Sequence, residues 1–251
     1  MEETKPTKKG PKNIDLRHAD LVFLLCYFVS GILDSSSYNA WTCFVSMQTG
    51  NTVFLGLGAS GQPHGKPYGW LKSLASIASF IVGSFIFSFL MRGRTKQRLA
   101  LSLSFAVQAL CIIVSAILVQ TRVVASHSES GEGKTDRAFI LKPLIPLILL
   151  ALQAGGQMAA SRGCGFNELP TTVLTSVYYD IASDPALTAG VAKNVKRNRR
   201  IGAGVFFLAG AIVGGWMYKG TNGSMAPGLW LAAGLKALGA VAWLFWRVEE
   251  S

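Results

Sequence analysis

Two polar clusters interrupt apolar stretches of the chain, and their residue types are those best suited to chemistry. The first is Gln48-Thr49-Gly50-Asn51-Thr52, and the second contains Thr171, Thr172, Thr175 and Ser176. Glycine weakens a helix, while asparagine and threonine side chains can hydrogen-bond to freed backbone groups. At membrane depth a broken helix is tolerated only where it is buried in protein or lines a wet cavity. Each cluster therefore predicts a broken helix suited to line a solute pathway.

An acidic residue at the end of the first apolar stretch completes the candidate site. An ionisable group at membrane depth is costly and indicates a functional site, so Asp34 is a candidate proton or cation site. Two alternatives stay open, because the polar side chains could simply join spans by interhelical hydrogen bonds and Asp34 could end a helix at the interface. The candidate pathway residues are Asp34, Gln48, Thr49, Gly50, Asn51, Thr172 and Thr175.

Composition places the chain in the helical membrane class. Half of the 251 residues are hydrophobic and 15% are charged, whereas a soluble domain has about 25% charged residues. The first 18 residues are predicted to be a disordered, basic cytosolic tail rather than a signal peptide, because many spans follow and no good cleavage site is present. The net charge of +11 is explained by loops beside the spans, so no nucleic-acid partner is expected.

Signatures of catalysis or metal binding are not found in the sequence. The three histidines lie in tails or loops without metal spacing, and the four cysteines lie singly. No G-x-S-x-G, P-loop or H-E-x-x-H motif occurs. We therefore expect no enzymatic activity, no metal and no cofactor.

Eight apolar segments follow the tail and form a single transmembrane domain, 19–247. They are Ala19–Leu33, Ala40–Ala59, Leu71–Met91, Leu99–Val119, Leu144–Ala160, Leu169–Ala182, Ile201–Tyr218 and Leu229–Trp246. A shift of about 126 residues places the first four segments on the last four, which indicates an internal repeat. The predicted halves are 19–120 and 144–247, with an outer loop at 121–143.

Positive charges predict the topology. Lys and Arg cluster in the tail, in Arg92–Arg98 and in Lys193–Arg200, and the positive-inside rule places all three regions in the cytosol. Three segments separate successive basic regions, although two points on one side must be joined by an even number of crossings. One segment in each half therefore fails to cross, and the polar second and sixth segments are the candidates. The short first segment is the alternative for its half.

The resulting fold prediction is an all-α polytopic membrane protein. It has about six transmembrane helices plus two broken or re-entrant segments, arranged as two inverted repeats with both termini in the cytosol.

The region around the first cluster also resembles a known family. The matching stretches are Gly31-Ile32-Leu33-Asp34, Ser37-Tyr38 and Phe44–Val53. They are similar to the signature of the YoaK-like membrane family (domain of unknown function 1275), roughly G-x-x-D-A-x-S-Y followed by F-x-x-x-x-T-G-N. The later stretch from Gly156-Gln157 through Pro170–Thr175 is similar to the second block of the family, in which Ser176 replaces the usual glycine. In the first block, Ser35 replaces the usual small apolar residue after Asp34. The resemblance covers roughly Ala19–Arg247 and implies a membrane protein without an established activity.

The leading functional hypothesis is a small-solute transporter or permease-like protein, with its pathway where the second and sixth segments meet. The alternative is a non-transporting membrane scaffold or signalling protein. The expected partners are the lipid bilayer, with the plasma membrane favoured, and a small-molecule solute. An oligomer of unspecified kind is compatible with the sequence.

Overall fold

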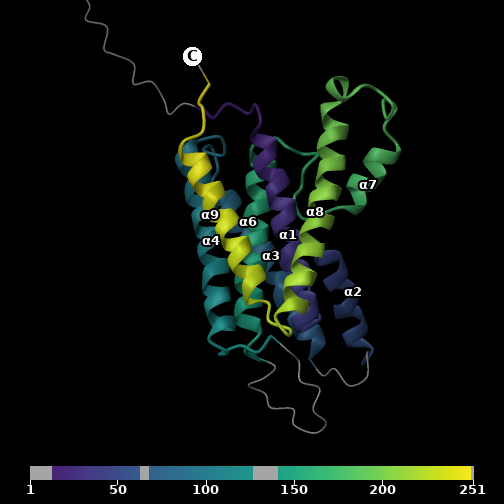
Figure 1. Cartoon of the computed structure of the whole chain (residues 1–251), viewed down its shortest axis with the longest axis vertical. Coiled ribbons are helices and arrows are strands. Elements are labelled where there is room, and N and C mark those ends of the chain that lie inside the picture. The colour runs from purple at the N-terminus through teal and green to yellow at the C-terminus, as the bar shows by residue number, and fades with distance from the viewer. Residues whose placement is uncertain (1–12, 63–67, 127–140, 250–251) are drawn as a thin grey trace, which may run out of the picture.

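The fold is a bundle of long helices with two short helices beside it (Figure 1). The computed structural model describes residues 13–62, 68–126 and 141–249, and within these ranges only isolated β-bridges accompany the helices. The helices are α1 (Ala19–Trp41), α2 (Gln48–Ala59), α3 (Gly69–Leu90), α4 (Arg98–Gln120), α6 (Leu144–Gly163), α7 (Thr175–Ala182), the 3₁₀ helix η1 (Val191–Lys193), α8 (Val195–Gly220) and α9 (Ala226–Leu244).

Six of the described helices have the length and apolar composition needed to cross a membrane. They are α1, α3, α4, α6, α8 and α9, with 19 to 26 residues each. By contrast, α2 has 12 residues and α7 has 8, which correspond to rises of about 18 and 12 Å against a hydrocarbon core of about 30 Å. The prediction of an all-helical membrane protein with six spans and two short segments is therefore confirmed.

The first span is longer than predicted. Helix α1 ends at Trp41 rather than at Leu33 and carries a run of serines through its last turns. Ser35 and Ser37 lie within the helix, and each hydroxyl donates to the carbonyl three residues earlier, at 3.1 and 3.3 Å. The alternative in which the first segment fails to cross is therefore wrong.

The first break lies before its polar cluster, whereas the second break contains Thr171 and Thr172 of the second cluster. Residues 42–47 are irregular, and Gln48 begins α2, so the predicted second segment starts too early. Thr42 ends α1 in the left-handed conformation, at φ 56°. The predicted sixth segment also starts too early, because residues 169–174 are irregular and α7 begins at Thr175.

Long helices pair closely in the bundle. Helix α1 packs on α8, α3 on α6, and α4 on both α9 and α6. Glycines permit the first two contacts, because a Cβ added at Gly31 or Gly210 would overlap the α8 or α1 backbone, respectively. In the same way, a Cβ at Gly83 or Gly155 would overlap the facing backbone of the α3–α6 pair. Close approach of the two backbones thus depends on one glycine from each helix.

The chain ends meet one of the basic loops. Ile14 is fully buried, its N–H donates to the Lys96 carbonyl at 2.8 Å, and the Asp15 N–H donates to the Arg247 carbonyl at 2.9 Å. Residues 13–18 therefore pack on the bundle, and the predicted disordered tail extends too far into the chain. Residues 1–12 of that tail and 127–140 of the predicted outer loop lie outside the described residues.

The second basic region lies at the same end of the bundle. Arg199, near the start of α8, forms ion pairs with Asp20 at the start of α1 (2.9 Å) and with Glu168 (2.8 Å). The start of α1, the Arg92–Arg98 loop, the start of α8 and the end of α9 thus share one end (Figure 1), which we call the basic end. This arrangement agrees with the prediction, made from the number of crossings between basic regions, that the two basic loops lie on the same side.

Candidate functional site

Asp34 holds the connection between α1 and α2. Its buried carboxylate accepts hydrogen bonds from the Val45 and Ser46 N–H groups, both at 2.8 Å, and from the Ser46 hydroxyl at 2.5 Å. Helix α1 continues from Asp34 to Trp41, a rise of about 10 Å. The chain must therefore turn back into the bundle by roughly that depth before α2 begins.

Asn51 and Gln48 hold the same connection from the other side. The Asn51 Oδ1 accepts from the Phe44 N–H at 3.0 Å, and its Nδ2 donates to the Phe44 carbonyl at 2.7 Å and to the Gln48 Oε1 at 2.8 Å. Ser76 of α3 adds a hydroxyl that also donates to the Phe44 carbonyl, at 2.8 Å. The polar cluster thus begins α2 and clamps the loop before it.

The remaining members of the first cluster have different surroundings. Thr49 is exposed. Gly50 leaves room for an aromatic side chain, because a Cβ there would lie 2.8 Å from the Phe44 ring. That ring stacks on Tyr38 and Phe54, with centroids 4.9 and 5.9 Å away. The absence of a side chain at Gly50 therefore lets α2 pack against the end of α1.

The connection between α6 and α7 also returns to the bundle. Ser30 of α1 donates to the Thr171 carbonyl at 3.1 Å. Gln157 of α6 donates through its Nε2 to the Ser30 hydroxyl at 2.9 Å and to the Thr171 carbonyl at 3.3 Å. Because α6 runs on from Gln157 to Gly163, about 9 Å further, residues 164–174 turn back by a similar depth.

The candidate threonines of the second half differ in burial. Thr172 is buried, and its hydroxyl donates to the Met158 sulfur at 3.6 Å and to the Pro170 carbonyl at 3.4 Å. Thr175 is the exposed first residue of α7. The structure thus places Thr172 beside α6 and leaves Thr175 on the outside.

The two short helices lie toward opposite ends of the bundle (Figure 1), where α2 packs on α3 and α7 packs on α8. The predicted contact between segments two and six is therefore not formed by packing of α2 on α7. Instead, the two returning connections contact successive turns of α1, one at Ser30 and the other at Asp34. Residues four apart on a helix lie about 6 Å from each other. The parts of the two connections that return furthest into the bundle, which we call the tips, therefore approach one region of α1.

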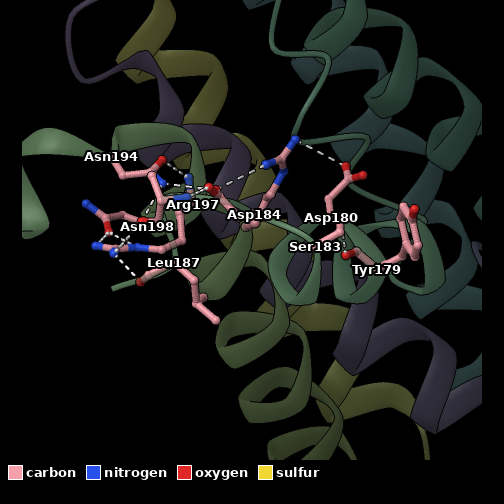
Figure 2. Close-up of polar contacts among 10 residues, drawn as sticks. Tyr179, Asp180, Ser183, Asp184, Leu187, Asn194, Arg197 and Asn198 are labelled. Carbon is pink, nitrogen blue, oxygen red and sulfur yellow. Dashed lines mark hydrogen bonds and ion pairs between the residues drawn. The ribbon is translucent and has the colours of Figure 1, made fainter. Parts of the chain in front are cut away.

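A separate polar network fastens the segment after α7 to the start of α8 (Figure 2). Arg197 donates to the Leu187 carbonyl at 2.6 Å, and Asn194 donates to the Asp184 carboxylate at 2.9 Å. This hydrogen bond from Asn194 is the largest cause of the lowered pKa of Asp184, and a hydrogen bond from the Ala186 N–H lowers that pKa further. The carboxylate therefore stays ionised at neutral pH and keeps this loop in place at the basic end.

Comparison with known proteins identifies a family. A family model described as a protein of unknown function (DUF1275) matches residues 22–242. The chain belongs to this family. The match includes both returning connections of this DUF1275 protein and agrees with the resemblance noted in its sequence. No curated protein and no solved structure matches the chain.

Sequence reasoning missed several polar residues of this DUF1275 protein. Ser30 gave no signal, because a serine in an apolar span is common in packed membrane helices. Thr171 belonged to the second polar cluster but was not among the candidate pathway residues. Gln157 and Lys236 did give one, since an amide or a charge within a span is costly. Within the described ranges, no group of His, Cys, Asp or Glu side chains is placed to hold a metal ion.

Proposed function

We propose that this DUF1275 protein is a small-solute transporter of the inverted-repeat type and has no enzymatic activity. The observation that carries the proposal is the approach of both returning connections, 42–47 and 164–174, to successive turns of α1 at Asp34 and Ser30. Irregular backbone at membrane depth is typical of transporter binding sites, where half-helices and free backbone groups face the solute.

Equivalent glycine contacts support the inverted repeat. The contacts are Gly31 with Phe207, Gly210 with Phe28, Gly155 with Phe80, and Gly83 with Leu152. Gly83 and Phe80 of α3 correspond to Gly210 and Phe207 of α8 at the same sequence shift, since 210 − 83 and 207 − 80 are each 127. Between α1 and α6 they also shift together, since 155 − 31 and 152 − 28 are each 124. The contact of α1 with α8 thus corresponds to the contact of α6 with α3. Such an exchange of partners between the halves is expected when a pseudo-twofold axis relates them.

In this proposal the solute passes along the buried face of α1 between the two tips. Asp34 and Asn51 act on the pathway by fixing the first tip, and Thr172 lies in the second. The basic end faces the cytosol, as the positive-inside rule requires, and the membrane is the plasma membrane. Asp34 is also the candidate proton or cation site.

One observation favours the scaffold alternative. Asp34 accepts three hydrogen bonds from Val45 and Ser46, and the Asn51 amide both accepts from and donates to Phe44, as expected for side chains that join structural elements. An experiment that needs no known solute separates the two functions, because a transporter must expose its tips to water.

The experiment places single cysteines at Ser46 and Thr172 in a chain whose four native cysteines are replaced by serine or alanine. Sealed vesicles of both orientations are treated with a charged, membrane-impermeant methanethiosulfonate. A transporter predicts reaction of Ser46→Cys from the side opposite the basic end and of Thr172→Cys from the basic end.

The matched control is Ala203→Cys, which replaces a fully buried residue of α8. It should stay unreactive in the folded protein. If both tip cysteines are as unreactive as this control, the pathway does not exist and the scaffold function is correct.

A further inference from the structure

A layer of buried polar side chains divides the hydrophobic core into two clusters. In α9, Ala240 belongs to the cluster at the basic end and Ala233 to the other, with Lys236 between them. Gln108 in α4 and Gln157 in α6 lie between the two clusters in the same way. We define the polar layer as Ser30, Gln108, Gln153, Gln157 and Lys236, each at most 2% exposed.

Lys236 brings an amine into this layer without an acidic partner. Its Nζ lies 2.6 Å from the Gln108 Oε1, 3.8 Å from the Cys26 sulfur and 4.9 Å from the centroid of the Phe105 ring. All three groups are neutral, and no carboxylate in the described part of the chain forms an ion pair with Lys236. Burying a lone cation costs several kcal/mol, and at membrane depth such a residue usually serves a substrate or ion.

The layer also contains acceptors without donors. The Oε1 atoms of Gln153 and Gln157 are buried and have no hydrogen-bond partner among the described residues. The Gln157 amide is oriented by its Nε2, which donates to the Cys26 carbonyl at 3.3 Å and to the Ser30 hydroxyl at 2.9 Å. Each unpaired buried acceptor lowers the free energy of unfolding by about 1 to 3 kcal/mol. A hydrogen-bond donor from a bound molecule would remove this penalty.

Lys236 and Gln157 share a neighbour in α1. Lys236 contacts the sulfur of Cys26, and Gln157 contacts the carbonyl oxygen of the same residue. Gln153 lies one turn from Gln157 on the same face of α6. One small molecule with a negative charge and a hydrogen-bond donor would compensate both defects.

We propose that the polar layer binds a small hydroxycarboxylate anion. Lys236 pairs with the carboxylate, and the Oε1 atoms of Gln153 and Gln157 accept a hydrogen bond from the hydroxyl. The three neutral neighbours of Lys236 favour a ligand with a net charge of −1 over a zwitterion, which would bring a second cation into the layer. This inference rests on the proposed transport function and names the class of its solute.

The test uses glycolate as the probe and isothermal titration calorimetry on the purified full chain in detergent. Acetate, which lacks the hydroxyl, and glycine, which adds an ammonium, are the comparison ligands. We expect saturable glycolate binding, about tenfold tighter than acetate binding for one additional hydrogen bond, and still weaker binding of glycine. Buried waters that satisfy the amides would give no saturable binding of any of the three, and this result would overturn the proposal.

Variants connect binding to the named residues. Lys236→Met should weaken glycolate binding about 30-fold or more, as expected when one partner of a buried charge pair is removed. Gln157→Leu should reduce the advantage of glycolate over acetate. The matched control is Lys219→Met at the end of α8, which should bind like the unmodified protein. Unchanged glycolate binding by Lys236→Met would remove Lys236 from the site.

Two measurements keep the outcomes separate. The melting temperature of each variant reports folding, and Lys236→Gln, which keeps a polar contact with Gln108, replaces Lys236→Met if the latter does not fold. Thiol accessibility at the tips reports the pathway independently of binding. Accessible tips without glycolate binding would overturn the solute class alone, whereas glycolate binding with inaccessible tips would overturn transport alone.

Discussion

At the scale of single residues, the polar side chains of the family motif act mainly on backbone. Asp34 supplies a carboxylate to two N–H groups and one hydroxyl that lie outside any helix. A buried carboxylate without partners would be strongly destabilising, and so would the unpaired N–H groups of the loop. The side chain and the loop therefore stabilise each other, and Asp34 sets the depth at which the chain turns back.

Asn51 should be essential for stability, whereas its neighbour Thr52 should not. Asn51→Leu removes the acceptor of the Phe44 N–H and should lower the free energy of unfolding by about 1 to 3 kcal/mol. Thr52→Val removes only an exposed hydroxyl bonded to the Gln48 carbonyl and should change it by less than about 0.5 kcal/mol. Melting of the purified proteins in detergent measures both, and equal melting temperatures would contradict the clamp.

The chemistry of these residues was predictable, but their partners were not. An acidic group at membrane depth and an amide beside a glycine are visible in the sequence, so Asp34 and Asn51 could be named. Their partners at Val45, Ser46 and Phe44 depend on how an irregular loop folds back, which no periodicity encodes. Lys236 is also visible inside an apolar run, but its neighbours come from other helices.

At the scale of helices, counting basic loops predicts that one segment in each half fails to cross, but neither which segment it is nor where the chain breaks. The polarity of the second and sixth segments made them the candidates, and α2 and α7 are indeed the short helices. The position of the break depends on local hydrogen bonds. Helix α1 continues to Trp41 through Ser35 and Ser37, although this serine-rich stretch resembles a helix end in the sequence.

Close helix approach gives a prediction with a control in the same helix. Gly210→Ala would drive a Cβ into the Phe28 carbonyl and should destabilise the protein by about 1 to 3 kcal/mol, the usual cost of overpacking. Gly215→Ala, where nothing lies within 4 Å, should be neutral or slightly stabilising because alanine favours a helix. Thermal melting of the two variants distinguishes them, and an equal effect would show that α1 and α8 do not pack through Gly210.

At the scale of the whole molecule, two basic regions lie at one end. The Lys96 carbonyl contacts Ile14, and Arg199 pairs with Asp20, so residues 13–18, the first basic loop and the start of α8 are neighbours. The opposite end holds the end of α2 and the start of α3 (Figure 1). The basic side chains of the described residues are therefore concentrated at the basic end.

This asymmetry predicts the sidedness of labelling. In the cysteine-free background, Arg94→Cys and Lys196→Cys at the basic end should react with an impermeant maleimide only in inside-out vesicles. Ser60→Cys, at the exposed end of α2, should react only in right-side-out vesicles. Labelling of Ser60→Cys and Arg94→Cys from the same side would mean that α3 does not cross the membrane.

The bridge between Ile14 and Val248 also bears on biosynthesis. A ribosome adds about 5 to 20 residues per second, so Val248 is made roughly 10 to 50 s after Ile14. During that interval the first residues to emerge have no partner at the far end of the chain. The bridge from Ile14 to Val248 therefore forms only after α9 has been synthesised, whereas the Ile14 N–H can bond to the Lys96 carbonyl earlier.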